Sequence, residues 1–142
     1  MIRKRTIRLA PFALAALAAL ALASAAPARG TTTITISHQM RGCHVWSVST
    51  GPQRPNLSVV IAPGSTLRFV NNDVMPHKLV RLSGPSLSLL KTANMNHAGA
   101  STSIRFTKTG VYKFTTKAGD DYMKGIKTVG EDNVLRLTVT VR

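Results

Sequence analysis

The strongest constraint on the fold is a two-residue alternation of apolar and polar side chains near the end of the chain. Apolar residues occupy every second position from Leu135 to Val141, and arginine or threonine fills the positions between them. Successive side chains of a β-strand point to opposite faces, so this spacing puts all the apolar side chains on one face. The segment is therefore predicted to be a strand with one buried face.

The same kind of pattern recurs from residue 31 onward. Further strands are predicted at 31–37, 57–61, 67–69, 78–82, 101–107 and 111–116. Turn signals such as Pro63-Gly64 and Thr109-Gly110 separate them, and no helix start signal precedes a long stretch with helical periodicity. Seven or eight short strands at this spacing predict an all-β domain, a two-sheet Greek-key β-sandwich.

Residues 1–28 follow a different pattern, which is typical of a secretory signal peptide. A basic start between Arg3 and Arg8 precedes an alanine- and leucine-rich run, and small residues then lead to Ala25 or Ala28. An uncleaved anchor is the alternative, but we expect cleavage after Ala28, which leaves residues 29–142 as one domain. The mature protein is then exported, to the periplasm, the cell envelope or the medium, without stable membrane insertion.

The strongly basic charge limits the choice of partners. The 142-residue chain has 19 basic and five acidic residues, and the leader holds four of the basic ones, so the mature domain keeps 15 basic against five acidic residues. This charge favours anionic partners, namely lipid headgroups, acidic wall polymers or an acidic redox or copper-transfer protein, although solubility alone also explains it. Because the basic residues are scattered and aromatic residues are few, we expect no nucleic-acid partner.

Residues with nitrogen and sulfur donors gather in four short segments. All four histidines, the single cysteine and four of the five methionines lie within residues 38–44, 75–77, 95–97 and 122–123. Imidazole, thiolate and thioether together form the ligand set that copper selects, whereas zinc and iron seldom recruit methionine. The predicted cofactor is therefore copper.

Cys43 has no second cysteine in the chain with which to form an internal disulfide. In an exported protein the alternatives are a metal-bound thiolate, a disulfide to another chain, or a buried inert thiol. The adjacent His44, and His38 five residues earlier, favour the metal-bound thiolate.

The sequence gives no support for hydrolytic catalysis, and we expect no enzyme. There is no Gly-x-Ser-x-Gly elbow, and no acid is placed as the partner of a histidine. Apart from Asp73, the acidic residues form adjacent pairs that we interpret as solvated turns: Asp120, Asp121, Glu131 and Asp132.

A resemblance to a known family spans about residues 31–141. The run from Val60 to Asp73, followed by Met75-Pro76-His77, resembles the cupredoxins, the family of plastocyanin and azurin. In that family a strand, a Pro-Gly turn and a second strand ending in Asn-Asn lead to the first copper histidine. Residues 109–114 resemble the strand that delivers the copper cysteine, and residues 122–125 resemble the loop with the axial methionine. The resemblance implies that His77 and Met123 are copper ligands.

The chain departs from the family pattern at the positions where the family has its copper cysteine and its second copper histidine. Residues 115–121 contain neither, so an ordinary blue-copper site cannot form from this loop. The family fold gathers four loops at one pole, which in this chain correspond to residues 38–46, 74–77, 94–99 and 117–125. These segments hold the soft ligands, and the missing ligands are therefore predicted to have moved within the same pole.

The predicted mononuclear site consists of Cys43, His77 and Met123, completed by His44 or His38. In an extended chain Cys43 and His44 point to opposite faces, unless Gly42 introduces a turn, and either histidine could instead support a ligand from outside the coordination sphere. Further candidate metal contacts, with core packing or a surface position as the alternative, are Met95, His97, Met40 and Met75. Trp46 is expected in the core rather than over a bound Cu(I).

These features predict an exported copper-binding protein that transfers single electrons. A thiolate site can cycle between Cu(II) and Cu(I), and a rigid sandwich holds its geometry nearly fixed. The surplus of soft ligands leaves a second hypothesis, an extracytoplasmic Cu(I) carrier or copper-resistance protein. A third is a metal-free secreted adhesion or wall-binding sandwich, because a fold alone does not determine a function.

Overall fold

The computed structural model describes residues 29–39, 44–88, 93–118, 124–125 and 134–142. Within these ranges nine strands form two sheets, and no helix occurs. The strands are β1 (Thr31–His38), β2 (His44–Val48), β3 (Asn56–Ile61), β4 (Ser65–Asn72), β5 (His77–Ser83), β6 (Asn94–Met95), β7 (Ser101–Phe106), β8 (Gly110–Ala118) and β9 (Arg136–Val141). The prediction of an all-β sandwich is confirmed.

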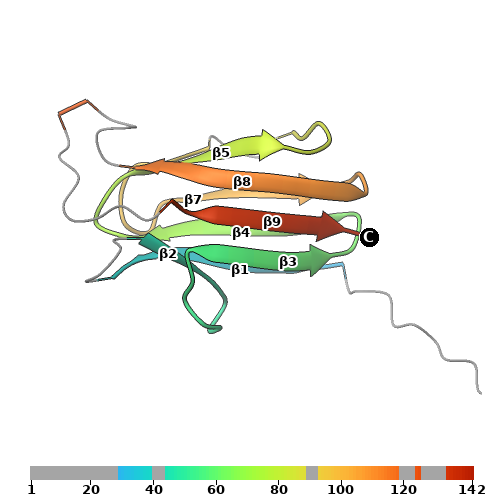
Figure 1. The fold of residues 1–142 in the computed structure, drawn as a ribbon, viewed down its shortest axis with the longest axis horizontal. Helices are drawn as coiled ribbons and strands as arrows, with labels where there is room; N and C mark the ends of the chain where they lie inside the picture. The colour runs from blue at the N-terminus through green and yellow to red at the C-terminus, as the bar shows by residue number, and fades with distance from the viewer. Residues whose placement is uncertain (1–28, 40–43, 89–92, 119–123, 126–133) are drawn as a thin grey trace, which may run out of the picture.

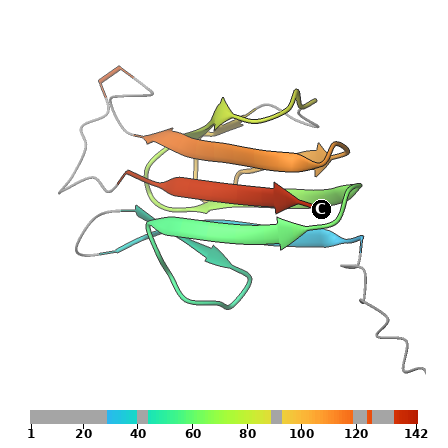
Figure 2. The same cartoon turned by 45° about the vertical axis from the view of Figure 1, so that its right-hand side comes forward.

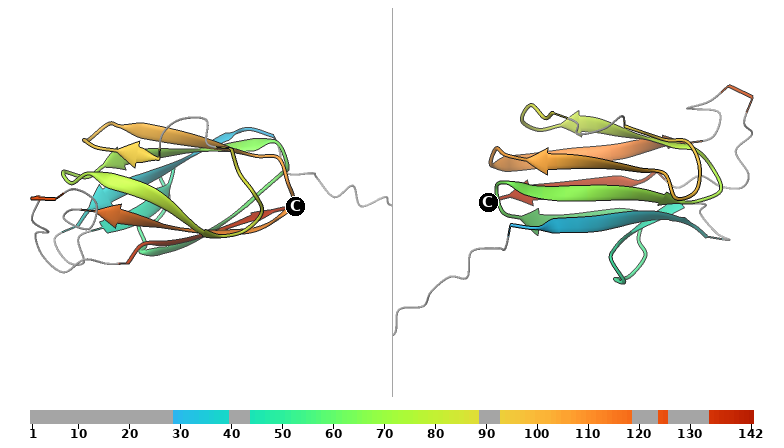
Figure 3. Two further views of the ribbon diagram at one scale, coloured as in Figure 1. Left: turned by 90° about the horizontal axis from the view of Figure 1, so that it is seen from above. Right: turned by 180° about the vertical axis from the view of Figure 1, so that it is seen from behind.

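The two sheets form two layers. One has the strand order β2-β1-β4-β7 and the other the order β3-β9-β8-β5-β6. The pairs β1–β4 and β3–β9 are parallel, and the other neighbours are antiparallel. Figures 1 and 2 show β3, β9 and β8 side by side in one layer, and the left view of Figure 3 shows the layers from above. The chain passes repeatedly from one sheet to the other, as expected of a Greek-key sandwich.

The core fills the space between the inner faces of the two sheets. Its fully buried side chains include Ile34, Ile36, Leu67, Phe69, Ile104, Phe106, Tyr112, Phe114, Leu137 and Val139. They come from alternate positions of their strands, so the apolar pattern identified the inward faces correctly. Trp46 is also fully buried, as predicted, and its indole N–H donates to the carbonyl oxygen of Pro55 at 3.1 Å.

Several strands end or begin at one pole of the sandwich. The last residue of β1, His38, pairs with the first residue of β2, His44. The first residue of β5, His77, pairs with Met95 of β6 on one side and with Ala118 of β8 on the other. The described parts of the predicted pole therefore meet, at the left-hand end in Figure 1.

The predicted signal peptide, residues 1–28, lies outside the described residues. In the part of the chain that the structure describes, no helix has the length and apolarity needed to cross a membrane.

Candidate metal centre

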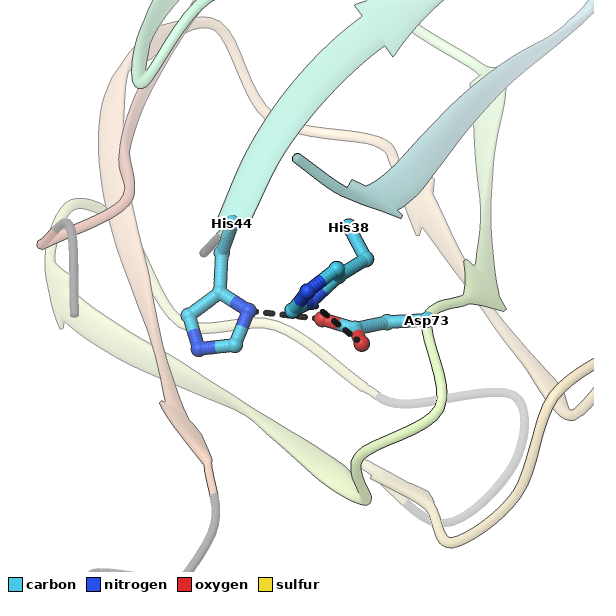
Figure 4. A group of neighbouring side chains, drawn as sticks. All are labelled: His38, His44 and Asp73. Carbon is cyan, nitrogen blue, oxygen red and sulfur yellow. Dashed lines mark hydrogen bonds and ion pairs between the residues drawn. The ribbon is translucent and has the colours of Figure 1, made fainter. Parts of the chain in front are cut away.

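Three histidines surround a single carboxylate at this pole. Oδ2 of Asp73 lies 2.6 Å from Nδ1 of His44 and 3.0 Å from Nε2 of His77. Its other oxygen, Oδ1, lies 3.4 Å from Nδ1 of His38. Figure 4 shows His38 and His44 on their adjacent strands with the carboxylate of Asp73 reaching toward both. Residues far apart in the sequence thus form one polar cluster.

Strand register brings the side chains of the cluster together. His38 and His44 are directly opposite in the antiparallel β1–β2 pair, so their side chains leave the same face of the sheet. In the other sheet, His77 lies directly opposite Met95, which puts the imidazole and the thioether on one face. Both of these side chains are fully buried.

A network of hydrogen bonds holds Asp73 in the turn between β4 and β5. The backbone N–H of Asp73 donates to Oδ1 of Asn71 at 2.9 Å, and the N–H of Met75 donates to Oδ1 of Asp73 at 3.2 Å. The side-chain amide of Asn71 also donates to the carbonyl oxygens of Met75 at 2.8 Å and Met95 at 3.0 Å. The turn is therefore tied to β6 as well as to itself, which fixes the carboxylate before any ligand binds.

Asp73 is a buried anion. Only 1% of its surface is exposed, and burial alone would raise its pKa. The hydrogen bonds from His44, His77 and the amide of Met75 outweigh this effect and hold the pKa of Asp73 well below its usual range. An ionised carboxylate accepts hydrogen bonds and donates none, so the imidazole nitrogens that face Asp73 must carry the hydrogens.

This requirement defines which atom of His77 is available to a ligand. If Nε2 donates to Asp73, Nδ1 of the neutral ring carries a lone pair. Nδ1 is buried and has no hydrogen-bond partner among the described residues. Most buried polar atoms are satisfied, so this nitrogen fits a metal ligand. The ring of His44 lies beside it, edge to face, with centroids 4.7 Å apart.

The remaining candidate ligands occupy different surroundings. Met75 and Met95 are buried, and Met95 packs against the hydrophobic core next to the cluster. His97 is exposed, and its Nδ1 lies 2.9 Å from the carbonyl oxygen of Ala98, so the structure does not bring it into the cluster. Three further candidates lie outside the described residues: Met40, Cys43 and Met123.

Asp73 is the functional residue that the sequence analysis missed. The expectation that no acid is placed beside a histidine is wrong, because Asp73 contacts His44 and His77 directly. One signal was present, since Asp73 precedes His77 by four residues across a short turn. The contact with His44, 29 residues away in the sequence, depends on strand register and on the packing of the two sheets, which the pattern of residues does not reveal.

No protein-family model matches the chain, and no curated protein sequence matches it. Among solved structures it is similar to a purple cupredoxin from Nitrosopumilus maritimus, with 20% sequence identity over 78% of this chain and 98% of that one and a TM-score of 0.45. It is also similar to a reduced amicyanin variant, with 21% identity over 78% of this chain and 82% of that one and a TM-score of 0.43.

These similarities concern the fold alone. A cysteine protease inhibitor from Entamoeba histolytica gives the same TM-score of 0.45, with 9% identity over 80% of this chain and 97% of that one. Because a fold alone does not determine a function, the function must be inferred from the side chains at the pole.

Proposed function

We propose that this protein is exported, binds one copper ion at the pole and transfers single electrons. The observation that carries the proposal is the burial and hydrogen bonding of the His77 ring. Its ring is fully buried and hydrogen-bonded to Asp73 through Nε2, while Nδ1 has no hydrogen-bond partner in the described part of the chain. A buried nitrogen lone pair of this kind is a costly feature unless a ligand binds to it.

The proposed ligands are His77, Cys43 and Met123, with a second imidazole from the same pole. Cys43 precedes the buried His44 directly in the sequence, and a thiolate beside an imidazole favours copper or zinc. A thioether shifts this preference toward copper, and Met95 supplies one on the same face of the sheet as His77. Bound in this set, copper supplies reversible one-electron chemistry.

The rigidity of the turn favours electron transfer over copper delivery. Asn71 ties the turn that carries Asp73 to β6, and Asp73 in turn orients two imidazoles. Donors that are already in place need little rearrangement when the charge of the site changes, which suits electron transfer. A carrier requires donors that exchange one at a time, and the exposed His97 stands apart from the cluster.

A basic surface next to the site favours the docking of an acidic partner protein. Among the described residues every lysine and arginine is exposed, and the single acidic side chain, Asp73, is buried. Lys78 and Lys117 lie directly opposite each other on β5 and β8, one residue away from His77 and Ala118. Like charges in this position repel, so an anionic surface docked over them would relieve the repulsion close to the metal centre.

The proposal is tested by titrating the purified mature domain with Cu(II) and recording its visible absorption. We expect a strong thiolate-to-copper charge-transfer band that saturates at one copper per chain. The band should disappear in Cys43→Ser and weaken strongly in His77→Ala. The matched control is His97→Ala, which removes an exposed imidazole outside the cluster and should leave the band unchanged.

The absence of a band would contradict an electron-transfer site with a thiolate ligand. A Cu(I) competition assay on the same samples would then separate the two alternatives. Tight Cu(I) binding would indicate a carrier, and no binding would indicate a metal-free sandwich.

A further inference from the structure

One oxygen atom of Asp73 forms hydrogen bonds with two imidazole rings, and a different ring nitrogen is used in each. Oδ2 lies 2.6 Å from Nδ1 of His44 and 3.0 Å from Nε2 of His77. Both rings are buried, with 2% of His44 and 0% of His77 exposed. A turn-forming role for Asp73 requires only the hydrogen bond from the Met75 amide, which uses the other oxygen, Oδ1. The contacts of Oδ2 with two buried imidazoles are therefore not explained by the turn.

This arrangement determines the tautomer of each ring. A neutral imidazole has one N–H and one lone pair, and the carboxylate takes the N–H of both rings. His44 is then left with its lone pair on Nε2 and His77 with its lone pair on Nδ1. Carboxylates that fix the tautomer and orientation of a metal-binding histidine in this way act from outside the coordination sphere.

The contact with His38 is weaker. Its Nδ1 lies 3.4 Å from Asp73 Oδ1, which is longer than a good hydrogen bond, and 37% of its side chain is exposed. The carboxylate therefore orients His44 and His77 and leaves His38 with more freedom.

We propose that Asp73 is a positioning residue that selects these two tautomers and thereby makes His44, rather than His38, the second imidazole ligand. The inference rests on the proposed copper site and goes beyond it in assigning ligand atoms, Nδ1 of His77 and Nε2 of His44. The same carboxylate adds a buried negative charge beside the metal. Negative charge favours Cu(II) over Cu(I), so Asp73 also lowers the reduction potential.

The first test uses the unmodified, metal-free protein. Long-range proton–nitrogen NMR correlations at mildly alkaline pH identify the protonated nitrogen of each neutral histidine ring. We expect the hydrogen on Nδ1 of His44 and on Nε2 of His77. A hydrogen on Nδ1 of His77, or on Nε2 of His44, would overturn the inference whether or not the protein binds copper.

The second test compares variants in the copper-loaded protein. Asp73→Asn should lower copper affinity by about 10- to 100-fold, the usual effect of removing such a support, and should shift the reduction potential upward. Asparagine can still accept the hydrogen bond from the Met75 amide, so a purely turn-forming role predicts no change in either quantity. Near-ultraviolet circular dichroism of the metal-free variant checks its folding, and the NMR test decides the matter if the variant does not fold.

A matched pair of variants tests the choice of histidine. His44→Gln should weaken copper binding strongly, and His38→Gln should leave the affinity and the absorption band nearly unchanged. The opposite result would overturn the assignment of His44. If the tautomers are as expected but wild-type protein binds no copper, the proposed function fails while the positioning of the rings stands.

Discussion

At the scale of single residues, the buried carboxylate of Asp73 makes the stability of the metal-free protein depend on pH. Its pKa in the folded state lies below its ordinary value of 3.8, so its stabilising contribution is complete above that value and is lost as the pH falls further. The free energy of unfolding, measured by chemical denaturation across the acidic range, should therefore decrease as the pH drops below about 4.

The variant Asp73→Asn provides the control for this pH dependence. It has no carboxylate to protonate at this position, so its free energy of unfolding should change less over the same range. Equal slopes for the two proteins would show that Asp73 does not hold the depressed pKa that its hydrogen bonds indicate.

The residues of the centre differ in how far the sequence revealed them. His77 could be predicted because a local motif, a strand ending in Asn-Asn and a short turn, precedes it. Asp73 lies in the same motif, four residues before His77, but was missed, since its contact with His44 depends on the packing of the two sheets. Cys43 and Met123 stay predictions, because they lie outside the described residues.

At the scale of elements, the alternation of apolar and polar residues predicted the strands that have one buried face. The observed bounds of β1, β5 and β7 lie within one residue of the predicted ones. Alternate side chains are buried in β1 and β7, whereas in β5 only His77 and Leu79, at its start, are buried. β2 was not predicted, and its burial explains why. His44, Val45, Trp46 and Ser47 are all buried, so both faces of this strand are covered and no alternation of polarity is present.

The short strand β6 was also missed, since two residues are too few to form a pattern. It nevertheless positions the centre. Met95 lies directly opposite His77, and its carbonyl oxygen accepts a hydrogen bond from Asn71. Two of the elements that hold the centre in place, β2 and β6, therefore have weak signals in the sequence, because their stability comes from contacts across the fold.

At the scale of the whole molecule, the grouping of ligand segments at one pole was predicted from the family resemblance. For the described residues the structure confirms that His38, His44, His77 and Met95 meet there. His97 follows Met95 by two residues in the sequence, and its side chain is exposed. The order of the strands within each sheet could not be predicted, since it depends on contacts between segments far apart in the chain.

The basic surface should steer charged reaction partners toward the molecule. We expect electron exchange with the anion ferricyanide to slow as salt is added, by on the order of tenfold between low and physiological ionic strength, and exchange with a cationic ruthenium hexaammine complex to accelerate. Stopped-flow absorption of the copper band measures both rates.

Two variants with the same change in charge show where on the surface this steering acts. Lys78→Gln removes a charge next to His77, and Arg142→Gln removes one at the end of β9, which lies away from the pole (Figure 1). The first should slow the ferricyanide reaction more than the second. Equal effects would indicate that only the net charge matters and that no docking site lies over the centre.

A crystal structure of the copper-loaded protein, with anomalous diffraction at the copper edge, would show whether copper binds to His77 at this pole. We expect one anomalous peak per chain, about 2 Å from Nδ1 of His77, the usual length of a bond between such a metal and an imidazole nitrogen. A peak located elsewhere, for example at the exposed His97, or no peak in crystals grown with stoichiometric copper, would contradict it.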